Sequence, residues 1–432
     1  MRSPERDIQK IPVEGVHVLT GRTGGSMKRF AGLSIAASVA FSTGAQAQLT
    51  MQMSNGWSFT FAGNVNAFGI FTRGSVDTAG TIAGGLVPEE KVTRIRTGLL
   101  PAFATLEAKG QEAGLDLTVH FGFAPQINSN GFHDNFGAQI DMRQVFLTAG
   151  GSWGQLLAGR ELGLYQRQNI LNDATLFGAG PTGGGVGAGG TTLGRIGFGY
   201  IYPNFNAQLT YSTPASSPLA LSIGLFDPSA IVGDTTTFDK TSTPRIEAEL
   251  SYTLPLGGSA KASDKVLLWV SGAYQHADSG VDTGPSVNAE GGGAGVRVEV
   301  GGVALVGSGY LAKGFGTTLM FGLPKAFTLA VDATGTERTS LGYIAQASYT
   351  VPATAWSVGG SWGESRMLET DNDKAIAADP LLKANSAAIV FVTYQWSKSL
   401  KHVFEGTYAQ STAFSGAKTK SFQGATGLML FF

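Results

Sequence analysis

Hydrophobic and polar residues alternate one by one along many segments of this chain. In residues 244–254, hydrophobic side chains are separated by polar ones that include Glu247 and Glu249. Residues 57–73 and 341–351 follow the same rule. A period of two belongs to a β-strand whose two faces meet different surroundings. The pattern therefore predicts an all-β protein.

Sixteen segments fit this description. They are residues 57–73, 92–108, 114–124, 138–149, 154–160, 194–202, 205–226, 244–254, 265–277, 292–300, 303–312, 338–351, 354–366, 386–397, 400–411 and 420–432. The segment 205–226 contains Pro214 and Pro218, which interrupt strand pairing. We interpret it as one bent strand, because bacterial single-chain barrels have an even number of strands.

The connections between these segments differ in length in a regular way. Tight connections such as 150–153 and 352–353 interleave with long ones such as 161–193 and 313–337. Aromatic residues gather near both kinds of connection, as at the two interfaces of a membrane. A soluble sandwich also alternates, but short turns at one end and long loops at the other are typical of an outer-membrane barrel. We expect a transmembrane antiparallel β-barrel of 16 strands, with short periplasmic turns and long extracellular loops.

A barrel of this size is expected to be hollow. A sheet in lipid must close on itself, since each unpaired edge amide would cost several kcal/mol. Eight strands are filled by their own side chains, whereas sixteen leave a water-filled lumen. The polar faces carry Arg, Glu, Asn, Ser and Thr, which stay hydrated. The expected function is a channel for passive diffusion of small hydrophilic solutes and ions.

The composition excludes several other classes of protein. Charged residues make up 14% of the chain, and cysteine is absent, which rules out thiol catalysis and Cys-based zinc sites. A net charge of -1 provides no basic field for nucleic acid. The histidines have no metal-ligand spacing, and the glycine motif at 185–190 lacks the strand and helix of a nucleotide site. We therefore predict no cofactor and no metal.

The N-terminal region has the three parts of an export signal. Lys28 and Arg29 precede an apolar stretch of twelve residues, and Ala45-Gln46-Ala47 forms a small-x-small end. We interpret residues 27–47 as a signal peptide and 48–432 as the barrel. Residues 1–26 precede a complete signal, so we expect them to be a mis-called N-terminal extension.

Residues 143–178 and the later segment RIGFGYIYPNF resemble the general (nonspecific) porins of the Gram-negative outer membrane. This resemblance implies a sixteen-stranded barrel, export through the periplasm, a homotrimer, and a third extracellular loop that folds into the lumen. It also implies contact with outer-membrane lipid and recognition by the barrel assembly machinery through the C-terminal Phe432.

In that family, acidic residues on the third loop face basic residues on the wall. By position, the third loop is about Glu161 to Leu193, and its candidate acids are Glu161 and Asp173. The candidate wall cations, which alternation places on polar faces in most cases, are Arg94, Arg96, Arg143, Arg160 and Arg195. An arginine facing lipid near the midplane would cost about 2 to 4 kcal/mol. The second half of the loop, Pro181 to Gly190, is rich in glycine, so we expect it to constrict the pore less rigidly.

Three alternatives to a nonspecific pore remain open, and one of them is a purely structural or adhesive barrel. A substrate-selective channel of the same fold could bind solutes between the third and sixth loops, where the apolar stretch Leu319 to Val331 is unusual. An enzyme is the third, since residues 150–154 and 359–363 both match G-x-S-x-G. That motif requires a strand-turn-helix setting, which neither segment has, so we predict that the protein is not an enzyme.

Overall fold

The computed structural model describes residues 49–87, 91–128, 140–183, 191–257, 264–280, 284–322 and 329–432. All of them belong to one compact unit, Ser34–Phe432. The predicted extension, 1–26, and the predicted signal peptide, 27–47, lie outside the described residues.

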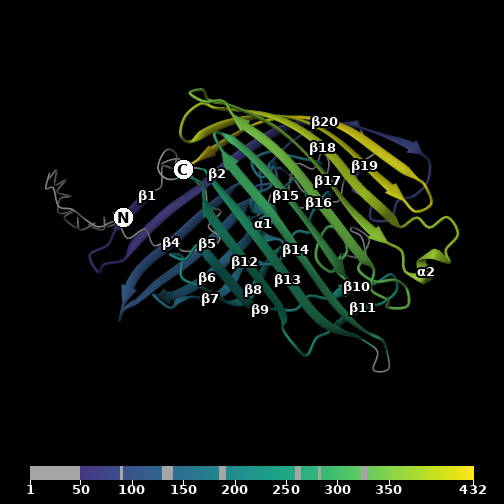
Figure 1. The fold of residues 1–432 in the computed structure, drawn as a ribbon, viewed down its shortest axis with the longest axis horizontal. Helices are drawn as coiled ribbons and strands as arrows, with labels where there is room; N and C mark the ends of the chain where they lie inside the picture. The colour runs from purple at the N-terminus through teal and green to yellow at the C-terminus, as the bar shows by residue number, and fades with distance from the viewer. Residues whose placement is uncertain are drawn as a thin grey trace, which may run out of the picture. The chain divides into compact units, whose positions relative to one another are not determined.

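The described residues are almost entirely β-strands (Figure 1). The strands are β1 (Leu49–Gln52), β2 (Ser58–Thr78), β3 (Lys91–Arg96), β4 (Phe103–Glu112), β5 (Leu115–Pro125), β6 (Ile140–Gly151), β7 (Gly154–Leu162), β8 (Phe205–Ser212), β9 (Leu219–Phe226), β10 (Ile231–Val232), β11 (Thr237–Lys240), β12 (Arg245–Pro255), β13 (Lys265–Ser279), β14 (Ser286–Val300), β15 (Val303–Lys313), β16 (Thr339–Thr350), β17 (Trp356–Leu368), β18 (Leu382–Gln395), β19 (Leu400–Ala413) and β20 (Lys418–Phe431). The helices are α1 (Arg167–Leu171) and α2 (Asp371–Lys374). Within the described residues, no helix is long and apolar enough to cross a membrane.

These strands form a closed antiparallel barrel. Each wall strand pairs with the next in sequence, and the last strand, β20, pairs with β2 from Asn64↔Phe431 upward. β3 and β4 both pair with β2 and share one wall position, while β10 and β11 lie in the connection between β9 and β12. β1 pairs with the start of β2. The wall therefore has the predicted 16 positions, filled by β2, β3 with β4, β5–β9 and β12–β20.

Two of the predicted strands are wrong, although their errors cancel in the total. Residues 205–226 form two strands, β8 and β9, and the prolines lie in the turn between them. Residues 194–202 form no wall strand. Gly197 and Gly199 have φ of 75° and 151° there, which breaks an extended strand.

A third strand, predicted at 92–108, is interrupted. Residues 97–102 are buried and separate β3 from β4. Pro101 lacks the N–H that a continuous ladder requires, and Leu99 donates its N–H instead to Gly178 of the third loop, at 2.9 Å. The wall therefore turns inward at this point and contacts the loop.

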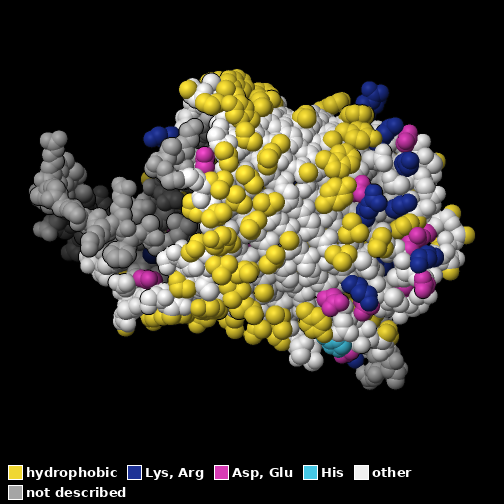
Figure 2. Space-filling model, viewed as in Figure 1, with side chains coloured by type: hydrophobic (Ala, Val, Ile, Leu, Met, Phe, Trp, Pro, Cys, Tyr) yellow, Lys and Arg dark blue, Asp and Glu magenta, His cyan; other side chains and the backbone are white. Residues whose placement is uncertain are grey.

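The two faces of the wall follow the predicted alternation. On β12, Arg245 and Glu247 are 1% and 0% exposed, whereas Ile246 between them is 44% exposed. Hydrophobic side chains cover much of the outer surface, and charged ones gather where the long connections lie (Figure 2). This is the arrangement of a barrel with lipid outside and polar groups inside.

The connections also separate by length. One end carries turns at 113–114, 152–153, 213–218, 301–302, 351–355 and 396–399. The other end carries the third connection, 163–204, and others such as 314–338 and 369–381. We refer to residues 163–204 as loop 3 and to residues 314–338 as loop 6.

Candidate pore constriction

Loop 3 leaves β7 and enters the interior of the barrel, where inward-facing residues of β12 and β13 bind its first part. Glu247 Oε2 accepts hydrogen bonds from the backbone N–H groups of residues 164 and 165, at 2.7 and 2.9 Å. Arg167 forms an ion pair with Glu249 at 2.7 Å, and Trp269 donates to Asn169 at 2.8 Å. The short helix α1 is therefore fixed to the wall from inside (Figure 1).

Glycines on the inward face of β14 make room for this contact. A Cβ atom at Gly291 or Gly293 would lie too close to the side chains of Tyr165 and Gln166 of loop 3. A Cβ atom at Gly295 would overlap with the ring of Trp269. The three glycines alternate along the strand, so all three face the lumen. Loop 3 therefore packs directly against the backbone of β14.

The middle of loop 3 contacts the opposite part of the wall. The Gln346 amide of β16 donates to the carbonyl of residue 172 and accepts from the N–H of residue 174, at 2.9 and 2.7 Å. Glu405 of β19 accepts from the N–H groups of residues 179 and 180, at 3.2 and 2.5 Å. Gln423 of β20 donates to the carbonyl of residue 180 at 2.7 Å. The loop thus reaches across the lumen.

The returning half of loop 3 is held by its own arginine. Arg195 is fully buried, and its guanidinium donates to the carbonyl of Ala387 at 2.6 Å and to the hydroxyl of Ser361. Gly199 donates its N–H to Ser365 at 2.9 Å. Arg195 was predicted to be a wall cation on a strand. It belongs instead to loop 3 and binds the wall formed by β17 and β18.

Arg94 and Arg96 lie on β3, with their side chains on the inward face opposite to Ile95, which is 70% exposed. Arg96 is 3% exposed, and its guanidinium donates to the carbonyl of Thr191 in loop 3. The structure therefore brings Arg96 against loop 3.

Arg160 does not face loop 3, whereas Arg143 contacts the end of this loop, where its guanidinium donates to Tyr202 Oη at 3.4 Å. Arg160 is exposed and lies on the outward face of β7, which also carries Leu156. Arg143 is skipped where the register of β5 and β6 shifts, and its guanidinium lies 2.8 Å from Asp141 and above the ring of Phe205. The same irregularity places Phe146, which is 4% exposed, on the inward face, although simple alternation from the exposed Met142 would place it outward.

The two candidate acids are buried inside the protein rather than aligned along an opening. Glu161 is 2% exposed; it accepts from the N–H of Leu162 at 2.7 Å and from the Gln144 amide at 2.8 Å. Asp173 is 5% exposed and accepts from Tyr200 Oη at 2.8 Å and from the N–H of Arg195 at 3.2 Å. Burial raises the pKa of Asp173 in spite of its hydrogen bonds. The carboxylate of Asp173 therefore fixes the shape of loop 3, whereas the carboxylate of Glu161 joins the end of β7 to β6.

Sequence reasoning missed the residues that bind loop 3. Glu247 was recognised only as part of a polar face, and Glu405, Gln346 and Gln423 were not singled out. The signal available was their position on inward faces. Their partners are backbone groups of loop 3, and the residue types of the loop do not indicate which backbone groups are bound.

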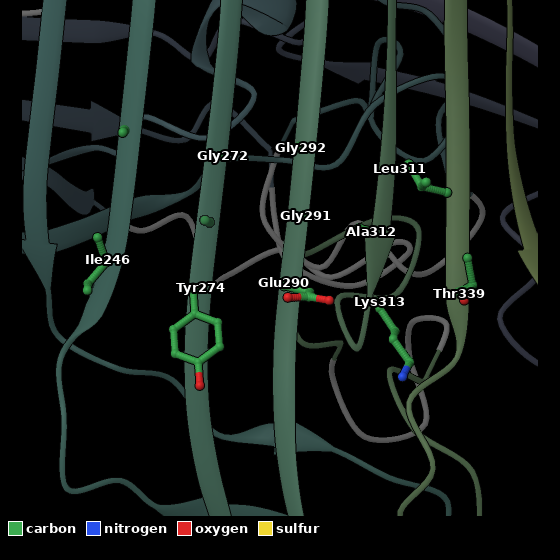
Figure 3. Close-up of a pocket in the computed structure, with 12 residues that line it drawn as sticks. Ile246, Gly272, Tyr274, Glu290, Gly291, Gly292, Leu311, Ala312, Lys313 and Thr339 are labelled. Atoms are coloured by element: carbon green, nitrogen blue, oxygen red, sulfur yellow. The ribbon is translucent and has the colours of Figure 1, made fainter.

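A separate hollow of about 680 Å³ lies on the wall formed by β12–β16 (Figure 3). Ile246, Tyr274 and Leu311 line it, and they are 44%, 42% and 59% exposed on the outward face. Gly272 and Gly292 also contribute to its lining. This hollow therefore opens to the outside of the barrel and is not part of the lumen.

The apolar stretch of loop 6 falls partly outside the described residues, which omit 323–328. Phe321, Ala330 and Val331 are at most 1% exposed and pack in one cluster with Tyr165 of loop 3. These three residues form core contacts rather than an open binding surface.

The family model of the Gram-negative porins matches residues 33–413. The chain belongs to the Gram-negative porin family. No curated protein matches its sequence. The fold of this porin is similar to that of the outer-membrane channel DcaP of Acinetobacter baumannii, with 13% identity, a TM-score of 0.64, and 88% of this chain and 99% of that chain covered.

Two further solved structures share the fold. An anion-selective porin from Comamonas acidovorans is 14% identical, with a TM-score of 0.56 over 87% of this porin and 100% of that chain. The trimer form of OmpT, an outer-membrane protein of Vibrio cholerae, is 14% identical, with a TM-score of 0.52 over 87% and 100%. The protein is thus an outer-membrane channel for passive diffusion.

The family consists of channel proteins, and the two G-x-S-x-G segments fit this. Ser152 lies in the turn between β6 and β7. Ser361 lies within β17, where it accepts a hydrogen bond from Arg195. Neither serine has the strand-turn-helix setting of a nucleophile.

Proposed function

We propose that loop 3 is the constriction of this porin and that the channel passes small hydrophilic solutes and ions without a specific binding site. The observation that supports this proposal is the attachment of loop 3 to both sides of the lumen, through Glu247 on β12 and Glu405 on β19. A segment attached on both sides narrows a water-filled passage. Solutes then cross by diffusion, sorted by size and charge.

A planar bilayer tests this proposal. Purified protein should give steps of ohmic conductance that rise linearly with salt concentration and show no saturable block by sugars, amino acids or dicarboxylates. Saturable block by one solute class would establish the substrate-selective channel instead. Absence of conductance would refute a channel altogether.

We propose that the porin is a homotrimer and that the outward face around Arg160 lies at its subunit interface. Arg160 is six residues from Gly154 at the start of β7, about 20 Å along the strand, which places it within the apolar band. Another subunit would shield its guanidinium from lipid. The trimer form of OmpT supports this assembly by analogy. Mass measurement in detergent or nanodiscs tests it.

We propose that residues 27–47 are a signal peptide, that residues 1–26 are not translated, and that the mature chain begins at Gln48. Mass spectrometry of protein purified from outer membranes tests removal of the signal peptide and the start at Gln48, and mass spectrometry of the unprocessed precursor tests whether residues 1–26 are translated. A precursor peptide from residues 1–26, or a mature protein that begins elsewhere, would contradict the proposal.

We also propose that the barrel assembly machinery recognises Phe432. This residue exchanges backbone hydrogen bonds with Gly63, at 2.8 and 3.0 Å, and its ring lies 5.1 Å from that of Phe61. Deletion of Phe432 should lower the amount of assembled barrel in the outer membrane without lowering synthesis.

A further inference from the structure

Two glutamates on separate parts of the wall bind loop 3 in the same way. Glu247 accepts from the consecutive backbone N–H groups of 164–165, and Glu405 accepts from those of 179–180. Seven strand pairings separate β12 from β19 around the sixteen-position wall, so the two carboxylates lie nearly opposite. The segment between the two attachments is the part of loop 3 that spans the lumen.

Both carboxylates are buried, with Glu247 0% and Glu405 7% exposed. A buried carboxylate is costly unless donors satisfy it, and hydrogen bonds to an ionised acceptor are stronger than neutral ones. Glu247 also pairs with Arg245 at 2.8 Å, and Glu405 accepts from Thr407 at 3.3 Å. The side chain of each glutamate is therefore also held in place by a second residue of its own strand.

The partners of these glutamates are main-chain groups. The hydrogen bonds themselves are therefore made by the main chain of loop 3, although Tyr165 and Gly180 are also closely packed against neighbouring groups. The glycine-rich sequence that follows, Pro181 to Gly190, has much backbone freedom. The second attachment lies immediately before it.

We propose that Glu247 and Glu405 are positioning residues that hold loop 3 across the lumen. These two residues of the barrel wall thereby set the mean conductance of the open channel and limit the rate of its conductance fluctuations. This inference rests on the proposed role of loop 3 as the constriction. Loss of either carboxylate is expected to let the adjoining half of the loop move, while the barrel stays folded.

Single-channel recording of E405A and E405Q tests the inference against E299Q. Glu299 of β14 is also an inward-facing carboxylate, but it pairs with Lys265 and Arg297 of the wall, at 3.3 and 2.6 Å. E299Q removes the same charge from the lumen without touching an attachment. E405A should change the mean conductance and raise the rate of conductance fluctuations about tenfold, as expected when a charge-assisted hydrogen bond is lost. E299Q should record like the wild type in both respects.

A thiol probe provides a second readout, since the chain has no cysteine. Ala179 is 0% exposed beside Glu405, so the thiol of A179C is expected to react slowly with a membrane-impermeant maleimide. Adding E405A should accelerate this reaction about tenfold, whereas adding E299Q should leave it unchanged. E247Q and E405Q should both raise the rate of conductance fluctuations relative to E299Q.

The outcomes separate the two proposals. A wild-type protein that does not conduct would refute the proposed function. If the wild type conducts, and E405A and E247Q form barrels by circular dichroism yet match E299Q in conductance and thiol reactivity, the positioning role is refuted and the channel function stands.

Discussion

The guanidinium of Arg338 lies 2.7 Å from the carboxylate of Asp373, and both side chains are almost fully buried. Arg338 precedes β16, whereas Asp373 belongs to α2 in the connection after β17. Arg338 also pairs with Asp234, from the connection after β9, at 2.6 Å. One arginine therefore joins three connections at the end of the barrel that carries loop 3.

This cluster predicts how the joined connections respond to acid. Burial opposes ionisation of Asp373, but the hydrogen bonds from Arg338 and Thr370, together with the charge of Arg338, outweigh it and lower the pKa. The nearby Asp332 behaves alike: hydrogen bonds from Thr370 and Asn372 overcome burial and lower its pKa. A lowered folded-state pKa stabilises the fold above the unfolded value, about 3.9, and this contribution is lost as pH falls through the folded value. The protection factors of amide hydrogen exchange in 369–375 should therefore stay constant from pH 7 to about 4 and fall below that pH.

Replacing Asp373 with Asn removes one of the two carboxylates around Arg338. We expect D373N to speed exchange in 369–375 at pH 7 and to make it less dependent on acid. D371N is the matched control, because Asp371 is exposed and its ion pair within the described part of the chain is with Lys374 on the same helix. Equal exchange in D373N and wild type would contradict the cluster's role.

Gly98 lies where the barrel wall contacts loop 3, so a larger residue at this position is expected to disturb the contact. A Cβ atom at this position would overlap with the carbonyl of Gly178 in the loop and approach the ring of Phe68. We expect G98A to lower the thermal stability of the barrel, by about 1 to 3 kcal/mol, since overpacking forces the backbone apart. G307A is the control, because nothing lies within 4 Å of a Cβ atom there. Thermal unfolding followed by circular dichroism checks both variants.

Lys401 predicts the sign of a change in ion selectivity. Its ammonium lies 4.7 Å from the centre of the Phe177 ring in loop 3, on the inward face of β19. Removing this positive charge beside loop 3 should shift the reversal potential of K401Q toward cation selectivity. K383Q removes a charge from the exposed Lys383, at the other end of the neighbouring strand, and should shift it less. A K401Q shift toward anions, or one no larger than that of K383Q, would contradict this prediction.

Arg160 tests whether protein or lipid covers the outer face of β7. If a second subunit covers it, R160L should lower the temperature at which the trimer dissociates. If lipid covers it, R160L should stabilise the barrel, by about 2 to 4 kcal/mol for a position near the midplane. Heat-dependent migration on gels distinguishes the two results.

The wall was predictable from the sequence, because alternation depends only on each residue and its neighbours. Glu247 and Ile246 point to opposite sides as expected. The prediction failed at 194–202, where Ile196, Phe198 and Tyr200 alternate like a strand. That segment is buried on both faces, and its glycines adopt positive φ, so its alternation does not report a boundary between lipid and water.

The site was less predictable for two physical reasons. Parity alone places Arg160 beside Leu156 on the outward face, so that error came from carrying a family position over without the face. The attachments at Glu405 and Glu247 are different in kind. They join residues separated by more than eighty positions through backbone groups, and only folding brings these together.

Loop 3 is held by main-chain groups at 164–165 and 179–180 and by a few buried side chains such as Arg167 and Arg195, so its exposed side chains remain available for other purposes. Substitutions at the surface of loop 3 can alter which solutes pass, while the scaffold that supports it is unaffected. The exposed side chains of loop 3 thus affect permeability, whereas other atoms hold the loop in place. A designer who wishes to retune this pore can rewrite the loop's exposed side chains and leave the glutamates of the wall alone.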